Sequence, residues 1–184
     1  MHHSDHPVFS DTPYIRKVSS LSPAQLAAID EQLQNCLQNN PEHLRKTHYF
    51  HGRYENLYVD ASSVSSDFPD LQPLIDESLH FCAEMLGVGT EALKIGYWFN
   101  LMEPGQITTL HRHDDYDEVI SGVVYLVAPD NSGDLVLVTG EGEISLPPIA
   151  GNFLSFSPAT PHKVSENRSS SRRLSIGMNI GLRD

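Results

Sequence analysis

The run GQITTLHRHDDYDE, residues 105–118, holds the side chains of this sequence that are best suited to bind a metal. It follows a segment with the composition of a strand, and alternate residues of a strand face the same side. If the extended geometry continues, His111, His113 and Asp115 point into one space. Two imidazoles and a carboxylate suit a borderline first-row metal, but a further protein ligand must come from elsewhere in the chain.

His162 is the candidate for that distal ligand. It follows the run GNFLSFSPATP, which is typical of a strand that ends in a turn. Strand ends distant in sequence can meet at the mouth of a two-sheet sandwich, where ligand sites are common. Two histidines and one carboxylate that leave three positions open are the ligand set of non-haem Fe(II) oxygenases.

A second set of polar residues lies in the last predicted strand. Arg173 and Ser175 share strand parity with Gly177 and Asn179, so one small, polar face runs inward. An arginine fork beside a hydroxyl suits a carboxylate, and could anchor the far end of a dicarboxylate whose other end chelates the metal. Arg172, of opposite parity, is expected at the surface.

Hydrophobic periodicity predicts two helices followed by a β-rich region. The first helix begins with Ser22 as N-cap and Pro23, and the second covers about 69–86 with Gly87 as its stop. A strand is expected at 14–18, and two short strands within 43–59. About seven β-rich runs follow, at 93–102, 107–112, 119–128, 134–138, 143–146, 152–157 and 172–181.

This order predicts a mainly β fold with N-terminal helices, in which two helices brace one face of a jelly roll. We expect one domain over 1–184, with a helical support at 1–89 and a jelly-roll core with the metal site at 90–184. Residues 61–67 are predicted to form a loop, and 43–59 could serve as a lid.

The net charge of -12 argues against nucleic acid and against an anionic membrane surface as partners. No run approaches the length of a membrane span, and the N-terminus lacks the pattern of a secretory signal. A cytoplasmic location is therefore expected. The apolar helix stripes would support a homodimer.

The C-terminal half resembles the 2-oxoglutarate/Fe(II)-dependent oxygenase superfamily, particularly its branch of small bacterial proteins. The matching segments keep the family's order over about 85 residues: YWFNLMEPG (97–105), the HRHDD run, SGVVYL (121–126), PPIAGNFLSFSPATPHKV (147–164) and RRLSIGMN (172–179). The resemblance implies a double-stranded β-helix. It also implies a dioxygenase that couples oxidative decarboxylation of 2-oxoglutarate to hydroxylation of a small-molecule or peptide substrate.

Carried over by this resemblance, His162 is the distal iron ligand, and Arg173 with Ser175 binds the distal carboxylate of 2-oxoglutarate. Tyr97 and Asn100 would line the cosubstrate pocket. The proximal motif can be assigned in two ways, as His113 with Asp115 or as His111 with His113. We favour His113, Asp115 and His162, because a carboxylate offsets part of the iron charge.

Two other interpretations compete. His111, His113, Glu118 and His162 match the ligand set of cupins, another jelly-roll family, which would need no 2-oxoglutarate. No glycine stands seven residues after Glu118, however, and Arg173 has no role in that scheme. The third interpretation is a metal-binding jelly roll without catalytic activity.

Overall fold

The computed structural model describes residues 7–113 and 117–183. The α-helices and 3-10 turns are α1 (Pro23–Asn39), α2 (Val64–Asp67), α3 (Leu71–Leu86), η1 (Pro7–Phe9), η2 (Pro41–His43) and η3 (Thr90–Ala92). The strands are β1 (Tyr14–Val18), β2 (Leu44–Phe50), β3 (Arg53–Val59), β4 (Leu93–Met102), β5 (Thr108–His111), β6 (Glu118–Val127), β7 (Leu135–Thr139), β8 (Gly142–Leu146), β9 (Asn152–Phe156), β10 (His162–Val164) and β11 (Arg173–Leu182).

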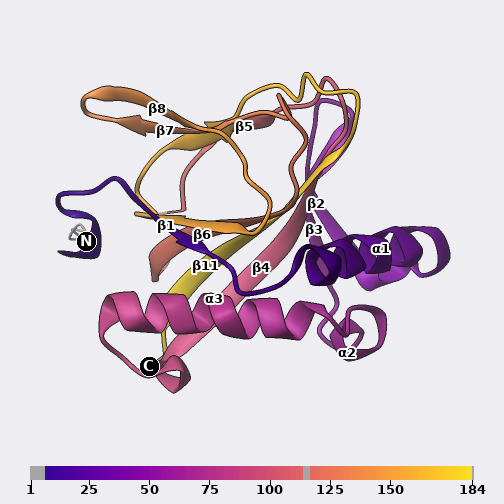
Figure 1. Ribbon diagram of the computed structural model, residues 1–184, viewed down its shortest axis with the longest axis horizontal. Helices are drawn as coiled ribbons and strands as arrows, with labels where there is room; N and C mark the ends of the chain where they lie inside the picture. Colours follow the sequence, from indigo (N-terminus) through magenta and orange to yellow (C-terminus); the bar gives the residue numbers. More distant parts are fainter. Residues whose placement is uncertain (1–6, 114–116, 184) are drawn as a thin grey trace.

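The strands form two antiparallel sheets. The larger has the order β1-β9-β6-β11-β4-β3-β2, and the smaller has the order β5-β10-β7-β8. The smaller sheet lies on one side of the larger one, while α1 and α3 lie on the other side (Figure 1). This is the jelly roll braced by two helices that the sequence predicts.

The larger sheet separates two hydrophobic cores. One packs the helices against the outer face of the sheet, with Ile29, Leu33, Phe99 and Ile176 among its buried residues. The other fills the space between the two sheets and includes Tyr125, Leu137 and Phe156. Alternate residues of the central strands therefore face either the helices or the interior of the jelly roll, which is where a site can form.

The two long helices begin and end as their sequences predict. The Ser22 hydroxyl accepts a hydrogen bond from the Gln25 N–H, and the Gln25 side chain accepts one from the Ser22 N–H, which forms a capping box before Pro23. At the other end of the helical layer, Gly87 adopts φ 67° and closes α3.

Two local predictions are corrected. Residues 64–67 of the predicted 61–67 loop form the short helix α2. His162 was expected in a turn that follows a strand, but it begins β10, a strand of three residues. So short a strand carries little sequence signal and forms because β5 and β7 pair with it on both sides.

Residues 43–59 form an edge of the larger sheet. Strands β2 and β3 make a hairpin that turns at Gly52, where φ is 77°, and β3 joins β4 through the pair Leu57 and Phe99. Tyr49 and Phe50, which lie just before this turn, are exposed. It extends the sheet past the mouth of the jelly roll.

No helix among residues 7–113 and 117–183 is long and apolar enough to cross a membrane.

We expect Leu33→Ala to lower the free energy of unfolding by about 2–5 kcal/mol, since the side chain is fully buried between α1 and the sheet. The matched control is Leu37→Ala, the same change on a half-buried residue of the same helix. Urea unfolding of both variants measures the difference. An equal loss in the two would contradict this account of the helix–sheet core.

His43 supplies a pH-dependent contribution to stability. Its Nδ1 lies 2.6 Å from Asp67 Oδ2, and this hydrogen bond raises the pKa of His43. Because the pKa of His43 is higher in the folded protein than in the unfolded chain, where it is about 6.5, protonation stabilises the folded state. This stabilisation is fully present below the pKa of the unfolded state and is lost as pH rises through the pKa of the folded state. We expect His43→Gln to reduce the decline in unfolding free energy from about pH 6.5 upward. Parallel stability curves for wild type and variant would contradict this.

Candidate functional site

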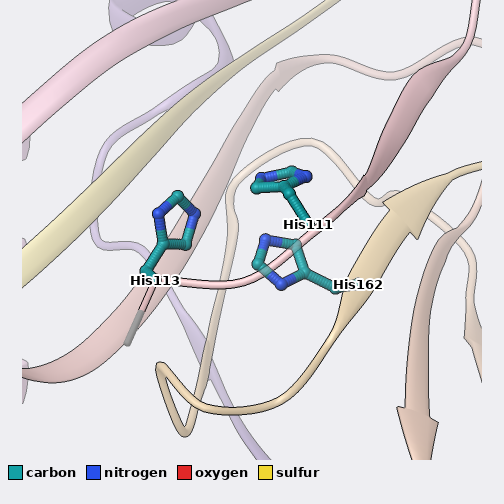
Figure 2. Close-up of side chains that lie close together, drawn as sticks. All are labelled: His111, His113 and His162. Carbon is teal, nitrogen blue, oxygen red and sulfur yellow. The ribbon is translucent and has the colours of Figure 1, made fainter. Parts of the chain in front are cut away.

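Three histidine side chains meet at the mouth of the jelly roll. His111 ends β5 and pairs directly with His162 at the start of β10. His113 lies two residues beyond His111, and one ligand nitrogen from each of the three rings lies within 4.8 Å of the other two. Figure 2 shows the three imidazoles converging on a common space. Three such nitrogens can hold a first-row metal ion.

Hydrogen bonds to the backbone fix the tautomers of two of these rings. His111 Nδ1 lies 2.7 Å from the Thr109 carbonyl oxygen, and His162 Nδ1 lies 2.9 Å from that of Thr160. A carbonyl can only accept, so each Nδ1 carries the proton and donates it. The Nε2 lone pair is thereby left for a metal, which is the usual arrangement of a metal-ligating histidine.

His162 is the most buried of the three ligands, with 6% of its surface exposed. Burial, together with the neighbouring His111 and His113, lowers its pKa to about 3. At neutral pH it is therefore a neutral imidazole, the form that binds a metal.

The position of His113 in the cluster does not result from the strand alternation that the sequence predicted. Strand β5 ends at His111, and beyond it the His113 N–H donates to the Pro158 carbonyl oxygen at 2.9 Å. The His113 backbone is thus held by the loop before His162, so the strand alternation expected from His111 does not continue to His113. Asp115, which we favoured as a ligand, lies outside the described residues. In the described part of the chain, the ligand group is the His111, His113 and His162 alternative.

A buried cation faces the same cavity. Arg173 begins β11, is 1% exposed, and its Nε has no hydrogen-bond partner among the described residues. Its Nη1 lies 3.3 Å from the thioether of Met102 and 3.4 Å from the Ser175 hydroxyl, neither of which carries a charge. Burial lowers the pKa of Arg173. An incompletely bonded guanidinium is costly to bury, so this position is suited to an anionic ligand.

The histidines and the arginine line one cavity between the two sheets. Ser175 and Asn100 also line it, and the Asn100 Oδ1 is a buried acceptor with no partner in the described part of the chain. Trp98 closes one side, with its ring centroid 5.7 Å from that of His113. Phe156 packs against His162 at 4.7 Å. A possible metal centre and an anion site therefore share one enclosure.

No family model and no curated protein sequence matches the chain. Solved structures do match its fold over nearly its whole length. A Pseudomonas putida prolyl-4-hydroxylase is 20% identical, with a TM-score of 0.68 and 93% of each chain covered. EvdO2 from Micromonospora carbonacea var. aurantiaca, complexed with 2-oxoglutarate, is 13% identical, with a TM-score of 0.67, covering 100% of this chain and 91% of that one. The epimerase SnoN, in complex with Fe3+, alpha ketoglutarate and nogalamycin RO, is 17% identical, with a TM-score of 0.69 and 92% and 78% covered.

The chain has the fold of the 2-oxoglutarate/Fe(II) oxygenases. This double-stranded β-helix agrees with the resemblance seen in the sequence. At these identities the likeness describes the fold, so the roles of individual residues depend on the geometry of this chain.

The cavity between the two sheets excludes one residue assigned to it from sequence. Tyr97 packs against the core on the helix side of the sheet, whereas Asn100 faces the cavity. The two residues are three apart on one strand, so strand alternation places them on opposite faces. The assignment of Tyr97 to the cosubstrate pocket is therefore wrong.

The cupin alternative also fails in its ligand set. Glu118 lies outside the group of metal-ligating side chains found in the described residues. It stands at the start of β6, after the segment 114–116, which lies outside the described residues. The described ligands therefore do not form the four-residue cupin site.

The sequence analysis did not identify the residues that support β5, the strand that carries His111. Strand β5 is four residues long, and β3 holds it from the side through two buried charged residues. Arg53 donates to the Ile107 carbonyl and to the Thr108 hydroxyl, while the Glu55 carboxylate accepts from the Thr109 N–H and hydroxyl, both at 3.0 Å. The available signal was their alternation in β3, where Arg53 and Glu55 are buried and Tyr54 between them is exposed.

These contacts form a relay to the metal centre. Glu55 accepts hydrogen bonds from the N–H and the hydroxyl of Thr109, and the Thr109 carbonyl accepts one from His111 Nδ1. Glu55 thus positions the carbonyl that sets the orientation and tautomer of a ligand ring. Such outer contacts commonly contribute to metal affinity.

We expect Glu55→Ala to weaken Fe(II) binding by about tenfold or more, because Thr109 and the His111 ring lose their support. Glu55→Gln should weaken Fe(II) binding less, since the amide oxygen of the glutamine can still accept a hydrogen bond from the Thr109 N–H. Competition against a chromogenic chelator under anaerobic conditions measures the affinities. The control is Glu141→Ala, which removes an exposed carboxylate at the turn between β7 and β8. Unchanged affinity in a folded Glu55→Ala protein would contradict the relay.

Proposed function

We propose that this chain is an Fe(II)- and 2-oxoglutarate-dependent dioxygenase that hydroxylates a small-molecule or peptide substrate. One observation carries the proposal: a three-histidine cluster and a buried, incompletely bonded arginine face a single cavity. A metal ion alone would explain the histidines. Only an anion that enters the same cavity also explains Arg173.

The residues present fit both groups. Iron would be held by the Nε2 atoms of His111 and His162 together with the ring of His113, which leaves coordination positions open. The distal carboxylate of 2-oxoglutarate would be bound by Arg173 and oriented by the Ser175 hydroxyl, since a guanidinium forms strong charge-assisted bonds with carboxylates. EvdO2 and SnoN have been solved with 2-oxoglutarate and with Fe3+ and alpha ketoglutarate, respectively, which supports this choice of ligands.

When bound, iron and 2-oxoglutarate supply the oxidising chemistry: 2-oxoglutarate and O₂ give succinate and CO₂, and one oxygen atom is inserted into a substrate C–H bond. The chain contributes position and shielding. Backbone carbonyls hold two ligand rings, Arg173 fixes the cosubstrate end, and Trp98 with Phe156 forms apolar walls that exclude water. The cupin-type alternative has no use for the buried arginine.

Anaerobic titration of the Fe(II)-loaded protein with 2-oxoglutarate tests the proposal. We expect a saturable metal-to-ligand charge-transfer band in the visible region, because the cosubstrate would chelate the iron. Arg173→Ala should raise the half-saturating concentration by at least about tenfold, the effect of losing a hydrogen-bonded charge pair. His162→Ala should abolish iron binding.

Arg172→Ala is the matched control, since Arg172 is the neighbouring residue but pairs with Asp30 of α1 at 2.6 Å, on the other side of the sheet. It should titrate as wild type does. Stoichiometric iron binding with no band in the wild-type protein would overturn the proposal and favour a metal-binding jelly roll without this activity.

A further inference from the structure

A second cleft opens directly outside the metal centre. It has a volume of about 440 Å³, within the range of ligand-binding pockets, and His111 and His113 form part of its wall. The β2–β3 hairpin contributes Phe50 and Tyr58 on one side, and Glu118 of β6 with Asn179 of β11 lies on the other. A molecule in this cleft would touch the ligand rings, so the cleft is placed to hold the primary substrate of the proposed reaction.

Glu118 is turned into this cleft by an irregularity in β6. The register between β6 and β11 shifts near Gly181, and the consecutive residues Val119 and Ile120 both pack against the helix-side core. A bulge of this kind changes the direction of the side chain beside it, and Glu118 consequently lines a recess of the cleft together with Asn179. The carboxylate stands next to the proposed reaction site because of this bulge.

The Glu118 carboxylate lacks a partner there. Its Oε2 is inaccessible to solvent and has no hydrogen bond within the described residues. A buried, unsatisfied carboxylate oxygen is destabilising, and each such group in a native structure calls for an explanation. Since an ionised carboxylate only accepts hydrogen bonds, the ligand that would satisfy it must be a donor, and a cationic donor would satisfy it best.

Two aromatic rings stand beside this carboxylate. Tyr58 and Trp98 lie with centroids 5.6 Å apart at 44°, and both line the recess that contains Glu118. Aromatic faces attract ammonium and guanidinium groups, and the chain already uses Tyr58 in this way, with the Arg45 guanidinium 4.8 Å from its centroid. Trp98 lies between Tyr58 and His113, on the path from the recess to the metal centre.

The other carboxylates around this site, Asp117 and Glu55, have partners of their own. Lys94 is paired with Asp117 at the rim, and Glu55 is bonded to Thr109. Arg112 is exposed at the edge of the cleft. Glu118 is therefore the carboxylate in the described part of the cleft that is positioned to bind a charged ligand.

We propose that the primary substrate carries a cationic nitrogen, an alkylammonium or guanidinium group, which Glu118 binds while Trp98 and Tyr58 pack against it. This inference rests on the proposed oxygenase function in one respect only, namely that the bound ligand is the substrate of that reaction. The cationic group would sit in the recess, and the rest of the molecule would extend past Trp98 toward the histidines. The reacting C–H bond would then lie some distance along the molecule from its charged end.

Trp98 provides a direct readout, because it is the only tryptophan in the chain. We would titrate the Zn(II)-loaded protein with n-butylammonium, n-butylguanidinium, n-butanol and butyrate, and record tryptophan fluorescence. The cationic probes should change the emission saturably, while the isosteric neutral and anionic probes should not. Titration in about 0.2 M NaCl suppresses the long-range attraction of an acidic protein for cations. Nα-acetyl-lysine methylamide is a fifth probe. Binding tighter than that of n-butylammonium would indicate a lysyl side chain as the natural ligand, and weaker binding would indicate a free amine.

Glu118→Gln should weaken the binding of the cationic probes at least about tenfold, since it replaces a charged acceptor by a neutral one of the same shape. Glu141→Gln removes one negative charge far from the cleft and should bind them as wild type does. Binding without selectivity for cations, or equal affinity in Glu118→Gln, would overturn the proposal. So would a variant whose loss is confined to metal affinity, because Glu118 would then serve to offset the charge of the metal. The charge-transfer titration with 2-oxoglutarate separately tests the oxygenase assignment, so the two failures can be told apart.

Discussion

The pairing of β5 with β10 is the constraint on which the site depends. It sets His111 opposite His162 across an antiparallel ladder, although the two residues are far apart in sequence. Each strand is short, and neither would be stable alone. They hold their register because β7 pairs with β10 on its other edge and because β3 supports β5 through Arg53 and Glu55. The arrangement of the three histidines thus depends on the smaller sheet and on contacts from the larger one.

The cavity interior is built against the usual preference of a core for apolar groups. Arg173 is among the largest fully buried side chains, and the buried polar atoms near it include the Asn100 Oδ1. A core that needed only stability would be filled with apolar side chains at these positions, since buried charges rarely stabilise a fold. The helix-side core shows that alternative on the same strands, where Phe99 and Ile176 belong to a buried apolar cluster. One sheet therefore carries stability on one face and a ligand site on the other.

The β2–β3 hairpin joins these two roles. Its buried charged residues support β5, and its residues Phe50, Asn56 and Tyr58 form a wall of the outer cleft. Because the same segment positions a candidate ligand ring and would contact a molecule in the cleft, changes in the hairpin are expected to affect metal binding and substrate selectivity together. The hairpin lies at the edge of the sheet, where its sequence is least restricted by packing.

Signals within short stretches of sequence were sufficient to predict the long helices and strands. Ser22 and Pro23 begin α1, Gly87 ends α3, and the alternation of the long strands indicates a jelly roll, because these signals act over a few residues. The spacing of His111 and His113, with His162 and Arg173 downstream, was likewise enough to indicate a metal centre beside an anion site. Tertiary structure decided the rest. Strand β10 exists only through its two neighbours, His113 depends on the Pro158 carbonyl, and Tyr97 is excluded because the sheet faces the helices on that side. Glu55 acquires its role from contacts with β5, and Glu118 acquires its orientation from the pairing of β6 with β11, and pairing over such distances in sequence has no local signature.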